Sequence, residues 1–310
     1  MSQPPSVAIV VLNWNGRDDT LECLASLRRV DYPACQVIVV DNGSHDDSVA
    51  TIREAAICAP TESSRLTLIE TGENLGYVGG NNVGLKHAQV LGVDYVLLLN
   101  NDTTVAPDFL RRLVEAAEAD PAVGVVGPTI YYFDRPDVIW SAGGAIDWQR
   151  GRTRMVGLDE QDRGQFGSEP RPVDFVTGCA LLIKRSVIER VGLLDVQFFA
   201  YYEETEWCAR AARAGFKICH VPRAKIWHKI SPTARADSPT THYYMTRNRL
   251  LFLAATHAGW QAWAHTLFDD LRTLVSWSVR PKWHPMHQQR DMMLKAIRDY
   301  FAGRLGRASL

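Results

Sequence analysis

The segment Tyr95-Val96-Leu97-Leu98-Leu99-Asn100-Asn101-Asp102 decides the fold class, because an apolar run leads directly into two amides and a carboxylate. Residues 96–99 are wholly apolar, which is typical of a strand covered on both faces in a parallel sheet. Such strands end at the crevice where open α/β sheets bind ligands. Asp102 could therefore hold a divalent cation through oxygen. The alternative is that residues 100–103 only turn the chain and that Asp102 or Thr104 helps to start the next helix.

The first half of the chain alternates between strand and helix patterns. Apolar, β-branched runs predict strands at 7–12, 37–40, 66–70, 95–99 and 123–126, and the intervening segments predict helices at about 46–56, 79–91 and 107–119. Asp18 or Asp19 could cap a further helix that carries Leu21, Leu24 and Leu27 on one face. This order implies βαβ units and a mostly parallel sheet with right-handed crossovers.

The pattern changes after Pro128. Residues 143–167 are rich in Gly, Arg and Gln and predict hairpins or a mobile loop. Further on, the patterns predict a helix at 203–214, a strand at 217–221 that leads to His228, helices at 243–258 and 260–279, and a last helix after Pro285. We therefore expect a main α/β domain at residues 1–240 and a helical extension at residues 241–310.

Composition excludes several classes of protein. The formal charge of −1 over 310 residues gives no reason to expect nucleic acid as a partner. The six cysteines form no C-x-x-C pair, so neither zinc nor a redox site is predicted, and a reducing cytoplasm is the simplest location. The sequence shows no signal peptide and no apolar run of the roughly 20 residues that a membrane span needs.

Small, amide or carboxylate residues follow four of the predicted strands. The four clusters are Asn13-Trp14-Asn15-Gly16, Asp41-Asn42-Gly43-Ser44, Asn74-Leu75-Gly76 with Gly79-Gly80-Asn81-Asn82, and Asn100-Asn101-Asp102. Turn chemistry explains any one of them, but these strand ends converge on one crevice. Asp41 could accept from a base N–H or a ribose hydroxyl, and the glycines would let the backbone approach a ligand. The dinucleotide and P-loop fingerprints are absent.

These clusters, in this order, resemble an inverting family 2 glycosyltransferase of the GT-A fold, in the branch that includes bacterial rhamnosyltransferases. The matching segments are 10–15, 39–44, 74–82, 97–102, 176–185, 198–216 and His228. The resemblance implies a GT-A (Rossmann-like) α/β fold, with a mostly parallel sheet flanked by helices and a C-terminal helical extension. Together with the strand-end argument it makes these residues candidates for nucleotide binding: Asn13, Trp14, Asn15, Asp41, Asn42, Asn74, Gly76, Gly79, Asn82 and Asn101.

The resemblance also implies a metal site. Asp102 stands at the last position of the family's D-x-D motif, which here reads Asn-Asn-Asp and keeps only that carboxylate. The implied cofactor is a divalent cation, Mn²⁺ or Mg²⁺. His228 could contact the metal or the diphosphate opposite Asp102. Its alternative role is that of a buried or loop histidine with satisfied hydrogen bonds.

A catalytic base is expected where a predicted helix opens. The family usually has Glu-Asp at this place, with Asp as the base, whereas this chain has Glu203-Glu204. The resemblance assigns the base to Glu204, with Glu203 as the second candidate. The alternative is that these acids, with Glu206, only complement the helix N-terminus.

The acceptor side of the pocket has four candidates. The segment Thr177-Gly178-Cys179-Ala180 resembles the one that shapes the sugar and acceptor pocket, with Gly178 admitting the ligand and Cys179 packed beside it. Trp207 and Arg210 lie one helical turn apart, so either could face the acceptor or the core.

The predicted C-terminal helices are rich in aromatic and basic residues. From Tyr244 to Leu310 there are ten Lys or Arg against four Asp or Glu. One interpretation is an interfacial helix at 260–279 that brings the enzyme to a lipid-linked acceptor as a peripheral membrane protein. The other is a helix packed on the catalytic domain or on a second copy, which the sequence favours because Asp269 and Asp270 interrupt the basic face.

The sequence therefore predicts an inverting glycosyltransferase with a nucleotide-sugar donor. By resemblance, the donor is dTDP-rhamnose and the acceptor is a hydroxyl of a cell-surface polysaccharide or its lipid-linked precursor. Two alternatives remain. One is a sugar nucleotidyltransferase, although residues 13–18 offer only Arg17 where that class carries a glycine-rich loop with Arg and Lys. The other is a nucleotide-sugar-binding protein of the same fold that has lost catalysis.

Overall fold

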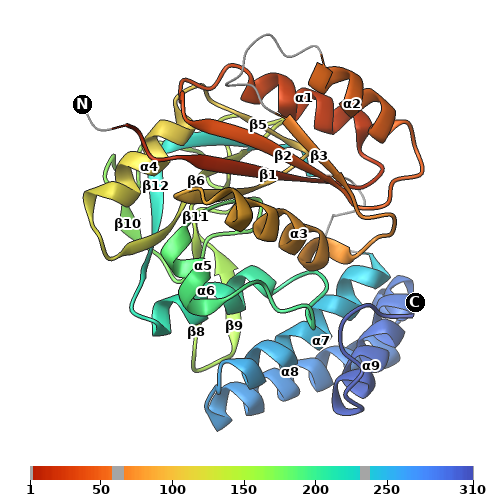
Figure 1. Cartoon of the computed structure of the whole chain (residues 1–310). Coiled ribbons are helices and arrows are strands. Elements are labelled where there is room, and N and C mark those ends of the chain that lie inside the picture. The colour runs from red at the N-terminus through yellow and green to blue at the C-terminus, as the bar shows by residue number, and fades with distance from the viewer. Residues whose placement is uncertain (1–2, 58–65, 231–237, 310) are drawn as a thin grey trace.

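One mixed sheet of ten strands runs through the molecule (Figure 1), a computed structural model that describes residues 3–57, 66–230 and 238–309. Its order is β10-β12-β6-β11-β4-β1-β2-β3, with β5 paired to β12 and β7 paired to β6. The strands are β1 (Val7–Asn13), β2 (Cys35–Asp41), β3 (Leu66–Glu70), β4 (Tyr95–Asn100), β5 (Thr103–Val105), β6 (Val123–Tyr132), β7 (Ile139–Ser141), β10 (Arg171–Pro172), β11 (Ala180–Lys184) and β12 (Lys217–His228).

Helices cover both faces of the sheet. They are α1 (Arg17–Leu27), α2 (Ser48–Ile57), α3 (Gly76–Leu91), α4 (Phe109–Ala119), α5 (Arg185–Val191) and α6 (Glu203–Arg213). Alternate side chains of β1 enter two separate cores, with Val7, Ile9 and Val11 packed toward α1 and α4, and Ala8 and Val10 toward α3. Both faces are apolar because both are buried, as predicted from the run at 96–99.

The parallel half of the sheet confirms the predicted βαβ order. β1 pairs in parallel with β2 on one side and with β4 on the other, so the carboxyl ends of these strands lie together. β11 lies antiparallel between β4 and β6, which makes the sheet mixed. The fold class is therefore α/β with a mostly parallel sheet flanked by helices, as expected.

Three local predictions were wrong. α1 begins at Arg17 after Gly16, and no side chain caps it, so neither Asp18 nor Asp19 is the cap. Asp102 is followed by the strand β5 and not by a loop alone. β12 continues seven residues beyond the predicted end at Val221, through a register shift between Val221 and Lys225.

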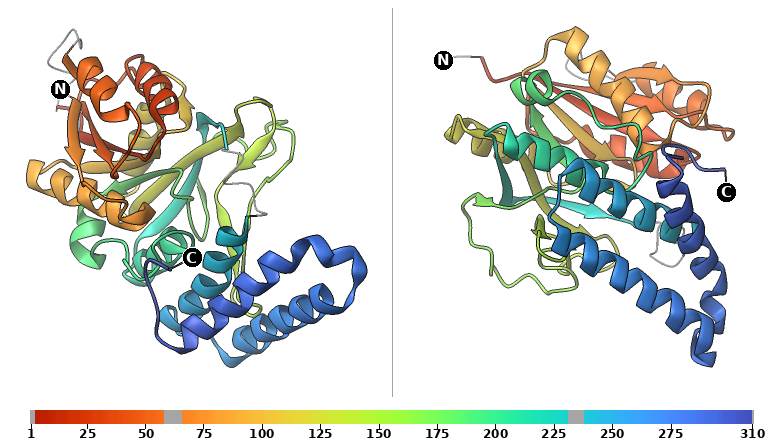
Figure 2. Two further views of the ribbon diagram at one scale, coloured as in Figure 1. Left: turned by 90° about the vertical axis from the view of Figure 1, so that its right-hand side faces the viewer. Right: turned by 90° about the horizontal axis from the view of Figure 1, so that it is seen from below.

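A group of helices follows the sheet in sequence and packs beside it (Figure 2). It contains α7 (Pro239–Ala255), α8 (Trp260–Val279), a 3-10 helix η3 (Pro281–Met286) and α9 (His287–Phe301). A predicted hairpin is present as β8 (Gly144–Asp147) and β9 (Arg152–Met155), and Arg152 of β9 pairs with Asp269 of α8.

The expected division between the α/β domain and the helical extension, at residues 240–241, lies in the first turn of α7. Among the helices of the described residues, none is long and apolar enough to cross a bilayer.

The close approach of α3 to β1 requires a glycine. A Cβ on Gly84 would lie 2.2 Å from Val10 Cγ1 in a fully buried core. We expect Gly84→Ala to lower the free energy of unfolding by about 1–3 kcal/mol despite the better helix propensity of alanine. Urea unfolding measures this, with Gly259→Ala as control, where the new Cβ would meet only Gln261 Oε1 at 3.8 Å. Equal midpoints for the two variants would contradict the packing argument.

Candidate active site

The ends of β1 and β2 are joined by a buried hydrogen-bond network. Asn13 Nδ2 donates to Asp41 Oδ1 at 2.7 Å and to Ser44 Oγ at 3.1 Å. Ser44 in turn donates its hydroxyl to Asp41 Oδ1 and its N–H to Asp41 Oδ2. The structure therefore brings the first two predicted clusters together. Ser44, for which the sequence suggested no separate role, is part of the network.

The fourth strand end joins the same network. Asn101 Nδ2 donates to Thr20 Oγ1 at 2.9 Å and lies 3.3 Å from Asn13 Oδ1. Asn15, in the left-handed region with φ of 51°, donates its N–H to Ser44 Oγ and accepts from the N–H of His45. Trp14, beside it, is 54% exposed. The predicted residues thus form an ordered rim with an exposed indole, the kind of surface on which a nucleobase can stack.

The third cluster is shaped by amide side chains. Asn42 donates to Asn74 Oδ1 and Gly76 O and accepts from the N–H of Leu75, so both ends of its amide are used in fixing the turn. Gly76 has φ of 76°, and a Cβ there would lie 2.5 Å from the Phe199 ring. No residue larger than glycine therefore fits at position 76, where the turn meets the segment before α6.

Two residues of the third cluster lie in α3 and make internal contacts. Asn82 donates to Leu194 O and accepts from the N–H of Leu194, at 2.9 and 3.1 Å, so its amide bridges α3 to the segment after α5. A Cβ on Gly79 would lie 2.6 Å from Leu75 Cβ. Asn82 therefore fixes α3 to the segment after α5, and Gly79 leaves room for Leu75 at the start of the helix.

Asp102 and His228 are brought together by β5. This strand pairs antiparallel with the end of β12, with Thr103 opposite His228. As a result His228 Nε2 lies 3.1 Å from Asp102 Oδ1. Burial opposes protonation of His228, but the nearby Cys179 sulfur and the Asp102 carboxylate outweigh it and raise the pKa of His228. The structure thus places His228 beside Asp102, where the sequence analysis expected it opposite that carboxylate.

The Asp102–His228 pair fits a divalent cation. Asp102 Oδ1 is buried, and apart from its ion pair with His228 Nε2 it has no hydrogen-bond partner. A cation bound here would displace the proton of His228, because a histidine ligand must be neutral. Neighbouring ligands of an octahedral cation with bonds of about 2.1 Å lie about 3 Å apart, which matches the observed separation. No group of three or more His, Cys, Asp or Glu in the described part of the chain could hold a metal. A cation here would therefore depend on a ligand such as a diphosphate for further oxygens, as magnesium sites with substrate phosphates do.

Glu203 and Glu204 form the second charged group of the site. The Oε2 atoms of both are buried without a hydrogen bond. Burial raises the pKa of Glu204, while the backbone N–H of Gly178, among others, opposes the rise. Burial and the neighbouring Glu204 charge hold the pKa of Glu203 well above its usual range. The two neighbouring carboxyls therefore resist ionising together, and backbone N–H groups beside Glu204 favour its charged form.

The segment 177–179 connects the two charged groups. The backbone N–H of Gly178 donates to Glu204, and the Gly178 carbonyl accepts from the Tyr77 hydroxyl at 2.7 Å. Cys179, the next residue, lies against His228 and is buried. The segment that was predicted to shape the sugar and acceptor pocket thus lies between the Asp102–His228 pair and the candidate base Glu204.

The residues before α6 have a strained backbone that α7 holds in place. Phe199, Tyr201 and Tyr202 have φ of 64°, 70° and 71° although none is glycine. Asn248 of α7 donates to the carbonyls of Phe198, Ala200 and Tyr201 at 2.7–2.9 Å. The neighbouring Arg247, which is fully buried, donates to the carbonyls of Gln197, Phe198 and Gly306. Neither residue was predicted from the sequence, because a helical pattern does not show which amide or guanidinium group is buried.

Trp207 and Arg210 face the protein interior. Trp207 is 1% exposed and donates its indole N–H to Gly192 O at 2.9 Å. Arg210 pairs with Glu206 and donates to the carbonyls of Val191 and Leu193. Of the two orientations that the sequence left open, the structure shows the one toward the core, where both side chains fix α6 to the end of α5.

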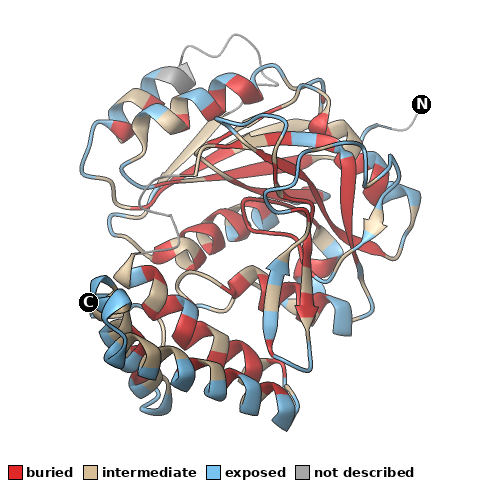
Figure 3. Ribbon diagram, turned by 180° about the vertical axis from the view of Figure 1, so that it is seen from behind, coloured by how far each residue is buried: buried red, intermediate tan, exposed pale blue. Residues whose placement is uncertain are grey.

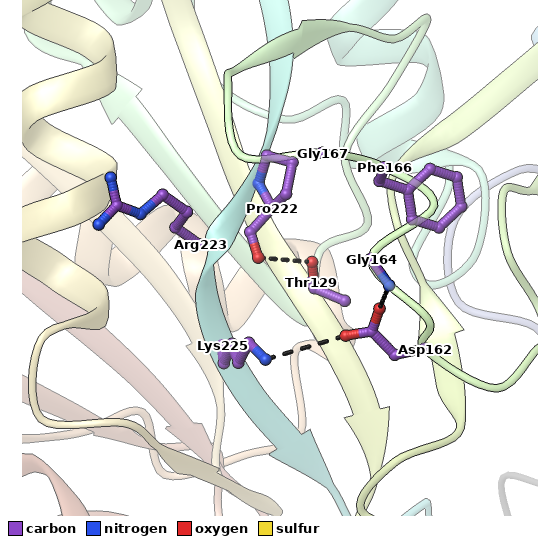
Figure 4. A pocket seen from close by; sticks show the side chains of 8 residues that line it. All are labelled: Thr129, Asp162, Gly164, Phe166, Gly167, Pro222, Arg223 and Lys225. Carbon is purple, nitrogen blue, oxygen red and sulfur yellow. Dashed lines mark hydrogen bonds and ion pairs between the residues drawn. The ribbon is translucent and has the colours of Figure 1, made fainter.

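A separate hollow of about 340 Å³ lies beside the register shift of β12 (Figure 4). Its polar groups bind one another. Asp162 accepts from the N–H of Gly164 and lies 3.8 Å from Lys225 Nζ, and Thr129 donates to Pro222 O. None of the four strand-end clusters lines it, so this hollow is not the crevice described above.

Comparison with known proteins identifies the family. The sequence profile described as glycosyl transferase family 2 matches residues 6–192. The chain belongs to this family. An N-acetylglucosaminyl-diphospho-decaprenol L-rhamnosyltransferase of Mycobacterium tuberculosis is 28% identical over 260 residues, 76% of this chain and 80% of that protein. The dTDP-rhamnosyl transferase RfbF of Shigella flexneri is 23% identical over 263 residues, 81% of each chain.

Solved structures show the same fold. The mannosyltransferase PcManGT from Pyrobaculum calidifontis, in complex with GDP-Man and Mn²⁺, aligns with a TM-score of 0.60 at 17% identity, over 97% of this chain and 88% of that one. GalNAc-T7 with UDP, GalNAc and Mn²⁺ aligns with a TM-score of 0.65 at 15% identity, over 97% and 57%. The predicted GT-A fold and family 2 glycosyltransferase are confirmed, and the sugar nucleotidyltransferase alternative is set aside.

The α7 contacts give a test of how the base is positioned. We expect Asn248→Ala to lower the free energy of unfolding by about 1–3 kcal/mol, because the carbonyls of Ala200 and Tyr201 lose this donor while that of Phe198 keeps Arg247. It should also lower kcat more than donor affinity, since Glu204 follows the strained segment directly. Urea unfolding, steady-state kinetics and donor titration measure these effects, with the exposed amide variant Gln288→Ala as control. An unchanged kcat in a destabilised protein would show that Asn248 matters for folding only.

Proposed function

We propose that this family 2 glycosyltransferase transfers rhamnose from dTDP-rhamnose, with inversion, to a hydroxyl of a lipid-linked glycan precursor of a cell-surface polysaccharide. The rhamnosyl transfer named for both curated relatives supports the sugar. The diphospho-decaprenol in the name of the first supports the lipid-linked acceptor. The observation that carries the chemistry is the placement of Glu204 and the Asp102–His228 pair on either side of residues 177–179.

In this proposal the nucleoside lies on the rim formed by the ends of β1 and β2. Asn13, Asn15, Asp41 and Asn101 build this rim, and Trp14 offers the exposed ring beside it. Asn42, Asn74, Gly76, Gly79 and Asn82 act through the shape of the turn that closes the site. The diphosphate then reaches Asp102 and His228.

Transfer requires one proton acceptor. Glu204 takes the proton of the acceptor hydroxyl, whose oxygen bonds to the anomeric carbon on the face opposite the nucleotide while the bond from that carbon to the diphosphate breaks. In this proposal Glu203 keeps the proton of the pair, so that no second negative charge lies near the attacking oxygen, and its raised pKa supports this assignment. A divalent cation at Asp102 and His228 would neutralise charge on the leaving diphosphate. Trp207 and Arg210 hold the helix that carries the base.

The assignment of the base is tested by replacing each glutamate in turn. Glu204→Gln removes the proton acceptor and should lower kcat by about 10²–10⁴-fold with donor binding retained. Glu203→Gln mimics a carboxyl that is already protonated and should cost far less. Rhamnosyl transfer and nucleotide release measure both variants against wild type. The reverse order of effects would assign the base to Glu203.

The raised pKa of Glu204 predicts the acid limb of the pH profile. The base must be ionised, so kcat should rise with pH through a pKa above the ordinary glutamate value of 4.5. Because the folded state keeps these carboxyls protonated at a pH where the unfolded chain ionises them, the stability they contribute is greatest at low pH and falls as pH rises. A pH series of kcat and of urea unfolding measures both. A limb at or below 4.5 would contradict the buried environment of the base.

Cation dependence follows from the Asp102–His228 pair. We expect EDTA to stop nucleotide release and Mn²⁺ or Mg²⁺ to restore it, with Asp102→Asn needing a higher cation concentration because one anionic ligand is lost. Cation titrations of donor binding and of release measure this, with Glu204→Gln as a matched control that loses release but keeps cation-dependent binding. Full activity in EDTA would exclude a role for the cation.

A further inference from the structure

The helix α8 exposes its large apolar side chains and buries small or polar ones. Ala262, Thr266 and Asp270 are its buried residues. Its exposed large side chains lie at helical spacing along the opposite side and are 52–76% exposed: Trp260, Phe268, Leu271, Val275 and Val279. Figure 3 shows the outer side of the C-terminal helices largely exposed. A helix that only packed on its own domain would have the reverse arrangement.

The acidic residues of α8 point inward. Asp269 pairs with Arg152 of the β8–β9 hairpin and lies 3.6 Å from Arg272 of its own helix, and Asp270 pairs with Arg249 of α7. Their side chains are only 18% and 5% exposed. In the sequence these acids interrupt the basic pattern and favour packing or dimerisation. In the structure they anchor α8 and leave its outer side free of negative charge.

The outer side of α8 is also basic. Arg272, Arg280 and Lys282 are exposed on it and on the start of η3, and no Asp or Glu among described residues 260–290 is exposed. A shallow hollow of about 540 Å³ lies among these groups, and its lining includes Phe268, Leu271, Val275, Val279, Trp277 and Trp283 with Arg272 and Arg280. We call this surface, made by Trp260, Phe268, Leu271, Val275, Val279, Arg272, Arg280 and Lys282, the α8 face.

We propose that the α8 face docks on an anionic lipid bilayer. Apolar and aromatic side chains flanked by Arg and Lys match the interface of such a bilayer, where the apolar groups enter the headgroup boundary and the cations meet lipid phosphates. A second copy fits less well, because a two-fold contact through this face would bring its cations to a surface without exposed carboxylates. Charge complementarity therefore selects the lipid.

Docking would bring the enzyme to the surface that holds the lipid-linked acceptor of the proposed function. The helix α7, which holds the segment before Glu204, packs against α8 through Arg249 and Asp270. A lipid-linked acceptor would then diffuse in the same surface to which the enzyme is bound. The proposal relies on the proposed function only for this acceptor, and lipid binding itself needs no donor and no turnover.

Vesicle flotation of the full chain tests the proposal. Wild type should float with phosphatidylcholine vesicles that contain phosphatidylglycerol, less with phosphatidylcholine alone, and less at high salt. The triple variant Phe268→Ser, Leu271→Ser, Val275→Ser should lose more than about tenfold in partitioning, because its apolar contacts are removed. Arg280→Gln with Lys282→Gln should lose roughly 30-fold on the anionic vesicles.

The controls separate this proposal from its alternatives. Val90→Ser removes an exposed apolar side chain from α3, outside the α8 face, and should float like wild type. Nucleotide release from a soluble donor should be equal in wild type and the triple variant. If the wild-type protein floats but releases no nucleotide from any donor, this would count against the proposed function and not against docking. If wild type floats with neither kind of vesicle, the proposal is overturned. It is also overturned if light scattering shows that wild type is a dimer and the triple variant a monomer.

Discussion

The active site depends on a strained turn that another part of the chain holds in place. Phe199, Tyr201 and Tyr202 adopt left-handed backbone angles, which cost about 1–3 kcal/mol each for residues other than glycine. Such angles persist only where the surroundings fix them, and here the donors come from Arg247 and Asn248. The backbone turn places Glu203 and Glu204 at the first positions of α6. The helix α7 is therefore the part of the extension that supports the candidate active site.

The same extension reaches the donor side of the crevice. Arg307, in the tail after α9, donates to Asn74 O at 3.3 Å, and the tail is held by a bond from the N–H of Ala308 to the Tyr244 hydroxyl. Tyr244 stacks on Phe199, whose ring lies against Gly76. A single set of contacts thus joins the extension, the glycine turn and the segment before the base. A shift in any of these parts must be accommodated by the other two.

Local sequence patterns predicted what strand ends supply, but not what distant segments bring together. The ends of β1, β2 and β4 were predictable because apolar runs fix where those strands stop, and their polar clusters follow directly. The contact of Asp102 with His228 depends on β5, three residues that pair with a strand more than 120 positions away. Asn248 lies in a regular helical pattern, so only the folded chain shows that its amide is buried against three carbonyls.

The direction in which α8 faces illustrates the same limit and has a functional consequence. A pattern can show that Asp269 and Asp270 interrupt a basic, aromatic helix, but their partners Arg152 and Arg249 lie in other elements and decide which side is buried. Two inward ion pairs fix α8 through its polar side, so its apolar side has no place in the core. Because α7 contacts both α8 and the segment before Glu204, the same helix fixes the outward face of α8 and supports the proposed base.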